Sequence, residues 1–431
     1  MAILTVVRHT RAEEDSGRAE LVSSAQVGRY TFLATAFTLA SLASVAAGGI
    51  GTLGLIGLGA DSAGAMSLGL AFAFTGFVFG GIAGVCVQIG AYARTATSLA
   101  LGVLGAAFLL RAWGDTSVSL AWISWLSPLG WAVKVQAFSE NNLFPLLLML
   151  VAGVATFLLG VVLRGHRDLG MSLISPRDGH PHASRFLSTG FGLTSRLQRP
   201  GLIAWGIGLM IAGVVVGSVS GSIGEVLGDS GFGSAFAGGG DFESVFLTTL
   251  VSVLGMLSAV YGVQAALRSR SEELDGRVEP LLATPLTRIR WYGGYLAFAL
   301  AGSALVAVAA GIALGLAAQA FGAEAPLSDV VATAAAQTAA IWVLVGIAIA
   351  LIGLFPQAAF LAWIAIAISF VLTIFGPLLD LSDTVLGISP FRHIPDILGG
   401  EFEVQPMLIL FLIAALLTLA GLAGIRRRDI Q

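Results

Sequence analysis

The sequence predicts an all-α polytopic membrane protein of about ten transmembrane helices in two repeated halves. Composition is the first observation: 56% of the 431 residues are hydrophobic and 11% are charged, whereas soluble domains carry about 25% charged residues. The second is a series of apolar runs long enough to cross a bilayer. The third is a charged segment near the N-terminus that recurs in the second half of the chain.

The helices are expected wherever about 20 consecutive residues are mainly apolar, the length needed to cross the hydrocarbon core. The first half has four such runs and the second half has six, so the first half is expected to lack two helices. The runs are residues 31–58, 65–90, 96–113, 144–163, 202–221, 245–266, 291–319, 328–352, 357–379 and 407–425.

Orientation follows from the positions of Arg and Lys, because these residues concentrate in cytoplasmic loops. With ten spans and residues 1–30 in the cytoplasm, 19 of the 22 Arg and Lys fall on the cytoplasmic side, and only Arg111, Lys134 and Arg392 do not. We therefore expect a multi-pass protein of the cell membrane with both termini cytoplasmic. The outer loops are mainly acidic, with Asp61, Glu225, Asp229, Asp241, Glu243, Glu324 and Asp329.

The repeated segment aligns residues 11–29 with residues 270–288 without a gap, and seven of the nineteen positions are identical. A topological signal requires only basic residues, yet both copies also keep three Glu and one Gly. The identical pairs are Arg11/Arg270, Glu13/Glu272, Glu14/Glu273, Gly17/Gly276, Arg18/Arg277, Glu20/Glu279 and Arg29/Arg288.

The repeat extends beyond the charged segment and sets the domain organisation. Ser127-Pro128-Leu129-Gly130-Trp131 corresponds to Ser389-Pro390-Phe391-Arg392-His393, Pro145 to Pro406, and Arg167-Asp168-Leu169 to Arg428-Asp429-Ile430. We assign residues 1–169 to the first half and 201–431 to the second. Residues 170–200 are assigned to a cytoplasmic linker that includes an amphipathic interface helix over Arg185–Arg196.

Two explanations account for the unequal halves. Either the first half has lost two helices, or the sequence starts inside a longer reading frame, with Met1-Ala-Ile-Leu-Thr-Val-Val as the end of a span. We favour the second explanation, which places roughly 85 to 120 residues upstream by comparison with residues 185–268.

The charged segment is expected to form a short amphipathic helix at the cytoplasmic face in each half. Glu14 and Arg18 are four residues apart, as are Glu273 and Arg277, a spacing that supports helical ion pairs. In the second copy Leu274, Val278, Leu281 and Leu282 form an apolar stripe. Two such helices would suit two identical partner domains. The alternative is an ordinary basic loop, and Gly17 and Gly276 provide either a tight turn or close approach, or simply a helix end.

Several classes of protein are excluded by what the sequence lacks. There is no GxxxxGK[ST] loop for ATP, and we expect no metal site, cofactor, catalytic residue or nucleic-acid surface on this chain. The predicted spans contain no ionisable residue near their centres, although proton- or ion-coupled transporters depend on such groups. Energy for any transport would therefore have to come from another polypeptide.

The motif Arg-x-Glu-Glu-x-x-Gly-Arg-x-Glu, followed by Leu-Leu-Ala-Thr-Pro-Leu-Thr-Arg288, resembles a known family. Together with Ser389-Pro390-Phe391-x-His393 and Arg427-Arg428-Asp429-Ile430, it is similar to the fused, two-half permeases of bacterial ATP-binding-cassette exporters of the second type, the group linked to antibiotic and multidrug efflux. The resemblance implies six helices per half, a coupling helix between the second and third, and a re-entrant outer segment before the last.

The resemblance also implies partners and sites. Two copies of a cytoplasmic ATPase, which binds ATP and Mg, would dock on the coupling segments 11–29 and 270–288 through the seven repeated pairs. A central cavity would bind a hydrophobic or amphipathic small molecule, with lipid also possible, and its first candidates are Phe108, Tyr261, Phe360 and Trp363. The rival interpretations are a non-transporting membrane scaffold or decayed permease, and an ion-coupled transporter.

Overall fold

The computed structural model describes residues 1–115, 118–168, 170–174, 182, 184–187, 189–227, 242–376, 379, 381–400 and 403–427. Every regular element in these ranges is helical. Several sequence assignments fall outside the described residues: the linker residues 175–181, the outer acids Asp229 and Asp241, and the repeat members Leu169, Arg428, Asp429 and Ile430.

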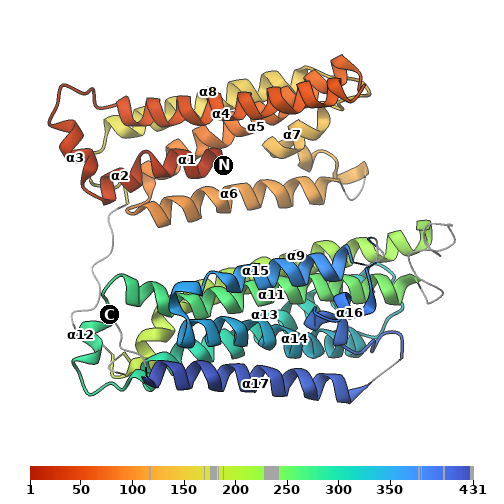
Figure 1. Cartoon of the computed structure of the whole chain (residues 1–431). Helices are drawn as coiled ribbons and strands as arrows, with labels where there is room; N and C mark the ends of the chain where they lie inside the picture. The colour runs from red at the N-terminus through yellow and green to blue at the C-terminus, as the bar shows by residue number, and fades with distance from the viewer. Residues whose placement is uncertain are drawn as a thin grey trace. The chain divides into compact units, whose positions relative to one another are not determined.

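The chain divides into two compact units, Met1–Gly179 and His180–Gln431. The division falls inside the linker assigned to residues 170–200. Each unit is a bundle of long helices with its own core (Figure 1).

Unit 1 is built around a central helix, α5, which packs against α4, α8, α6 and α1. Glycine permits the closest of these contacts: a Cβ placed on Gly160 of α8 would lie 3.1 Å from the carbonyl oxygen of Gly84 in α5. The helices are α1 (Ala2–Arg8), α2 (Arg11–Asp15), α3 (Arg18–Ser23), α4 (Thr31–Gly57), α5 (Ser62–Ile89), α6 (Ala93–Gly114), η1 (Val118–Leu120), η2 (Ile123–Leu126), α7 (Pro128–Lys134) and α8 (Phe144–Gly165).

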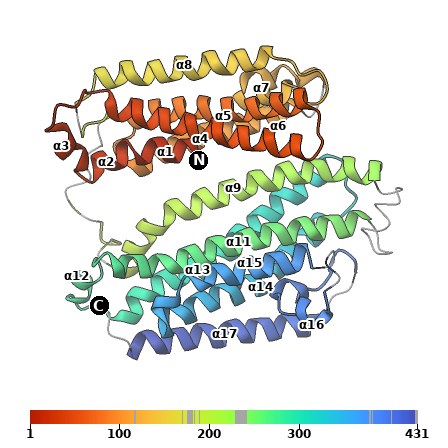
Figure 2. The ribbon, with the colours of Figure 1, turned by 45° about the horizontal axis from the view of Figure 1, so that its top comes forward.

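Unit 2 has two central helices, α13 and α14, packed against each other. Helix α9 packs along α13, and α17 lies along α14, as Figures 1 and 2 both show. The helices are α9 (Gly190–Leu227), α11 (Phe242–Leu274), α12 (Glu279–Leu282), α13 (Arg288–Ala320), α14 (Leu327–Leu354), η3 (Pro356–Ala358), α15 (Leu361–Ile374), α16 (Asp383–Leu386), η5 (Pro390–His393) and α17 (Val404–Arg427).

The described residues contain nine helices long and apolar enough to cross a membrane, which confirms the polytopic all-α class. The predicted span 357–379 differs from expectation: its helix, α15, has 14 residues. That length extends about 21 Å, whereas the hydrocarbon core is about 30 Å thick. Pro356 and the turn at residues 355–360 delay the start of the helix, which explains the shortfall.

The predicted interface helix at Arg185–Arg196 also differs. Residues from Gly190 onward form the first turns of α9, which continues through Pro200 into the apolar stretch. Arg185 and Arg196 of this stretch are exposed, but just beyond it the Gln198 side chain, 5% exposed, donates to the Ala265 carbonyl on α11 at 2.9 Å. Thr194 is buried as well. This part of the sequence is therefore a component of the bundle and not a separate surface helix.

The Ser-Pro segments fold back onto the preceding helix in both units. The Ser127 hydroxyl donates to the Ala107 carbonyl, 20 residues earlier, at 2.6 Å. The Ser389 hydroxyl lies 3.4 Å from the carbonyl of Ser369, also 20 residues earlier. Because matching residues make matching contacts, the internal repeat is a repeat of structure. The re-entrant outer segment implied by the resemblance has this form.

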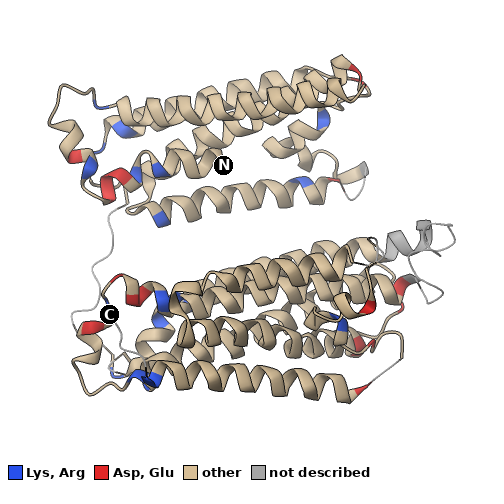
Figure 3. Ribbon diagram, in the orientation of Figure 1, with Lys and Arg blue, Asp and Glu red and all other residues tan. Residues whose placement is uncertain are grey.

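Charged side chains gather at the ends of the helices in each unit, and the long middle sections are almost free of them (Figure 3). This distribution is the one that a bilayer requires, because an ion at its centre is costly. Many apolar side chains in these middle sections are exposed, including Leu42, Leu53, Leu158 and Leu416. Lipid is the environment that accommodates them.

The contact between α14 and α17 depends on paired glycines, which gives a test of the packing. A Cβ on Gly353 would collide with the backbone of Gly421, which cannot move aside. We expect Gly353→Ala to lower the free energy of unfolding by roughly 1 to 3 kcal/mol, measured as a lower unfolding temperature of the purified protein in detergent.

The matched control is Gly293→Ala on α13, where a Cβ would meet nothing within 4 Å. It should be neutral or slightly stabilising, because alanine favours helices. Equal unfolding temperatures for the two variants would contradict the packing described for α14 and α17.

Candidate functional site

The repeated charged segment adopts the same backbone turn in both units. Gly17 and Gly276 have φ angles of 75° and 68°, in the left-handed region that favours glycine. In unit 2 the amide of Gly276 donates to the Glu273 carbonyl and that of Arg277 to the Glu272 carbonyl, the hydrogen bonds of a Schellman helix end. A Cβ at either glycine would meet nothing within 4 Å, so the positions need a turn and not close approach.

This turn corrects the expectation of one continuous amphipathic helix. The left-handed residue ends the first helix, and the chain restarts as α3 or α12 in a new direction. The predicted four-residue ion pairs do not form: Arg18 instead lies 3.5 Å from Glu13, and Arg277 lies 3.3 Å from Glu272.

The predicted apolar stripe of the second copy is split by the same turn. Val278 is 1% exposed and joins the core of unit 2, with Leu281 and Leu282 packed against it. Leu274, on the other side of the turn, is 69% exposed. Only the apolar residues after the turn, in α12 and just before it, therefore pack on the core of unit 2.

In unit 1 the first arginine of the motif is an interior residue. The Arg11 side chain is 2% exposed, and its Nη1 lies 2.8 Å from Glu14 Oε2. The same guanidinium donates to the backbone carbonyls of Ala91, Gly170 and Met171. Arg11 thus joins the charged segment to the α5–α6 connection and to the residues that follow α8.

The Glu14 carboxylate lies between two buried guanidinium groups. Its second oxygen is 2.5 Å from Nη2 of Arg167, and the two side chains are 8% and 2% exposed. Burial lowers the pKa of the Arg167 guanidinium, and the charge of Glu14 opposes that shift. The Glu14 carboxylate thus stabilises the charged form of this buried guanidinium.

A second acid of the segment contacts the start of a transmembrane helix. Asp15 Oδ2 accepts a hydrogen bond from the Ala93 amide at 2.6 Å, where α6 begins. A carboxylate at a helix N-terminus is stabilised by the otherwise unpaired amides and the helix dipole. Sequence reasoning did not assign roles to Asp15 or Arg167, although the repeat of Arg167-Asp168 at Arg428-Asp429 was a signal for the latter.

In unit 2 the corresponding acids are also buried. Glu272 and Glu273 are 6% and 3% exposed. Glu273 lies 2.9 Å from Arg270, the same three-residue pairing as in unit 1. Glu272 lies 3.4 Å from Arg268 on the preceding turn and 3.3 Å from Arg277 beyond the glycine. Both copies therefore pair a buried acid with the first arginine of the motif.

The remaining motif residues form the accessible part of the segment. The side chains of Arg18 and Arg277 are 71% and 61% exposed, and Glu20, Glu279 and Arg29 are exposed as well. Leu21 adds an exposed apolar side chain beside Arg18. Glu13, Arg270 and Arg288 are intermediate.

Comparison with known proteins relates this arrangement to efflux permeases. The family described as Multidrug efflux system permease Rv1217c, C-terminal domain, matches residues 1–164 and 187–426. The multidrug efflux system permease protein Rv1217c of Mycobacterium tuberculosis (strain ATCC 25618 / H37Rv) is 40% identical over 437 residues, an alignment that covers 100% of this chain and 79% of that relative. The chain belongs to the Rv1217c family of efflux permeases.

The four residues expected to line a cavity of this efflux permease have different environments. Tyr261 is 2% exposed and packs against α13, where its hydroxyl would contact a Cβ on Gly302 at 2.7 Å. Phe360 and Trp363 of unit 2 are 62% and 41% exposed, and Phe108 of unit 1 is 46% exposed. The structure places Tyr261 in the interior of the bundle and the other three on the surface of their own units.

The buried ion cluster of the permease yields a stability prediction. Glu14→Gln would leave the guanidinium groups of Arg11 and Arg167 without their shared carboxylate, and removing one partner of a buried ion pair costs about 3 kcal/mol or more. We expect a clear fall in the unfolding temperature of the purified protein.

Glu20→Gln is the control, because Glu20 is an exposed acid of the same motif and exposed ion pairs contribute about 1 kcal/mol at most. If both variants unfold at the wild-type temperature, the cluster does not hold the segment in place.

Proposed function

We propose that this efflux permease is the membrane subunit of an ATP-binding-cassette exporter that moves hydrophobic or amphipathic compounds out of the cell. In this proposal the chain sits in the cell membrane with its Arg-rich helix ends and both termini in the cytoplasm. A separate ATPase, which binds ATP and Mg, supplies the energy. Two copies of that ATPase dock on residues 11–29 and 270–288.

The observation that carries the proposal is the shared construction of the two charged segments. Each has a buried acid paired with the first arginine, a left-handed glycine, and an exposed arginine directly after it. A loop that served only as a topological signal would need basic residues but no buried acid and no fixed turn. Two similar surfaces on one chain fit two copies of one partner.

The buried half of each segment supplies the mechanical connection. Arg11 and Glu14 join α2 to the start of α6 and the end of α8 through backbone and ionic contacts. In unit 2, Val278 joins the segment to the core. A force on the exposed residues would therefore move the ends of the transmembrane helices, and closure of an ATPase dimer can drive a rigid-body change of this kind.

The distribution of polar residues favours an external energy source over ion coupling. In the described parts of the long helices, the polar side chains near mid-span are hydroxyls and amides, such as Ser303 and Gln337. Gln337 is 1% exposed, and its Nε2 lies 3.2 Å from the Ser252 hydroxyl. An amide donates and accepts hydrogen bonds without titrating, so it offers structural pairing and not a proton relay.

The test is copurification of the permease with the ATPase encoded beside it. We expect the paired reversal Arg18→Glu with Arg277→Glu to reduce the retained ATPase at least tenfold and to remove stimulation of ATP hydrolysis. The physical reason is that each exposed guanidinium group would be replaced by a carboxylate. If these arginines pair with acids of the ATPase, the attraction becomes a repulsion between like charges, which costs several kcal/mol.

Arg94→Glu is the matched control, since Arg94 is an exposed arginine at the same end of unit 1 but outside the motif. It should retain the ATPase. If the paired reversal also retains and stimulates the ATPase, the segments are topological loops, and the scaffold interpretation becomes the better one.

A further inference from the structure

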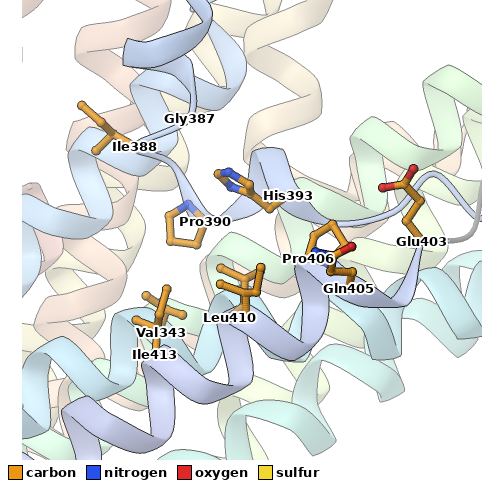
Figure 4. A pocket seen from close by; sticks show the side chains of 11 residues that line it. Val343, Gly387, Ile388, Pro390, His393, Glu403, Gln405, Pro406, Leu410 and Ile413 are labelled. Atoms are coloured by element: carbon orange, nitrogen blue, oxygen red, sulfur yellow. The ribbon is translucent and has the colours of Figure 1, made fainter.

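Unit 2 contains a pocket of about 430 Å³ at the end of the bundle where α17 begins. It lies between the re-entrant outer segment and α17, with Pro390 on one side and Leu410 on the other (Figure 4). Val343 of α14 and Ile413 of α17 form its apolar wall. A pocket of this size and lining suits a small organic molecule with a hydrophobic body.

Three polar side chains complete the lining: His393 at the end of η5, Glu403 just before α17, and Gln405 in its first turn. Glu403 and His393 are both exposed at the rim. Among the described lining residues none is Lys or Arg, so at neutral pH the carboxylate gives the rim a negative charge. The ring Nδ1 of His393 is 3.3 Å from the Ser389 carbonyl, which orients the imidazole.

The internal repeat places aromatic residues at the equivalent positions of unit 1. In the alignment of Ser127 with Ser389 and Pro145 with Pro406, the counterparts of Gly387, His393 and Gln405 are Trp125, Trp131 and Phe144.

These rings contact one another. Trp131 Nε1 donates to the Trp125 carbonyl at 2.7 Å, and the rings of Trp125 and Phe144 are 6.4 Å apart. The two Ser-Pro segments fold back in the same way, and at these three positions unit 2 has a glycine and two polar residues in place of large rings.

We propose that this pocket binds an amphipathic organic cation, with the apolar body on the wall of α14 and α17 and the charged group at Glu403. The chemistry is complementary: a carboxylate pairs with a cationic nitrogen, and the Gln405 amide offers a hydrogen-bond partner beside it. The inference deepens the proposed function by naming the charge class of the cargo, and it rests on that function for the identity of the ligand as cargo.

The experiment measures binding of ethidium, a planar organic cation, to the purified full chain in phosphatidylcholine nanodiscs by fluorescence anisotropy. We expect Glu403→Gln to weaken binding about tenfold. We expect the double variant His393→Trp with Gln405→Phe, which introduces the residues of unit 1, to abolish saturable binding by filling the pocket. Both substituted positions are exposed, so the bundle should still fold.

Glu140→Gln is the control, because Glu140 is an exposed acid in the outer segment of unit 1, and it should bind ethidium as the wild type does. Absence of saturable ethidium binding to the wild type, or unchanged binding by the double variant, would overturn the proposal.

Copurification of the same variants with the ATPase separates the two hypotheses. A double variant that keeps both ethidium and the ATPase refutes the pocket and leaves the exporter standing. If the wild type binds ethidium through Glu403 but retains no ATPase, the pocket stands and the exporter assignment fails.

Discussion

The absence of water from the bilayer core is the constraint on which the structure depends. Backbone polar groups must be paired within each helix, and ions are driven to the helix ends. Because lipid offers no hydrophobic driving force between helices, close packing has to hold them together. The glycines of this chain serve that purpose: Gly84 faces Gly160 in unit 1, and Gly353 faces Gly421 in unit 2.

The charged segments solve a related problem at the ends of the helices. An arginine buried beside a bilayer needs ionic and hydrogen-bonding partners, and Arg11 finds them in Glu14 and in three backbone carbonyls. The same contacts tie neighbouring helix ends together. The repeated spacing of charges thus combines buried side chains that fix the segment, such as Arg11, with exposed ones, such as Arg18. The glycine turn redirects the chain within the segment, and both sides of it contribute buried side chains: Glu273 before it and Val278 after it in unit 2.

The two units share a backbone design but differ in what fills it. Ser127 and Ser389 make corresponding contacts with the preceding helix, so the Ser-Pro segment returns along the same path in both. Side-chain size differs at three positions along that path: Trp125, Trp131 and Phe144 of unit 1 correspond to Gly387, His393 and Gln405 of unit 2, where a pocket is present.

The sequence by itself determined the class of fold, the approximate positions of the spans and the existence of the repeat. These follow from hydropathy and from the alignment of residues 11–29 with residues 270–288, both of which are local properties of the chain. It also indicated that the motif needs glycine. It left open whether the glycine provides a tight turn or close approach, or simply ends a helix. Periodicity predicted a helix through Gly276, because helical spacing carries no information on where a left-handed residue ends it.

Only the tertiary structure decided which motif residues are interior. Arg11 and Arg18 look alike in sequence, yet one is 2% exposed and the other 71%. The difference depends on Arg167 and on the backbone beyond α8, which lie far away along the chain. The continuation of residues 190–196 into α9 was likewise decided by packing, because Thr194, a polar residue that hydropathy alone assigns to water, is buried against α13.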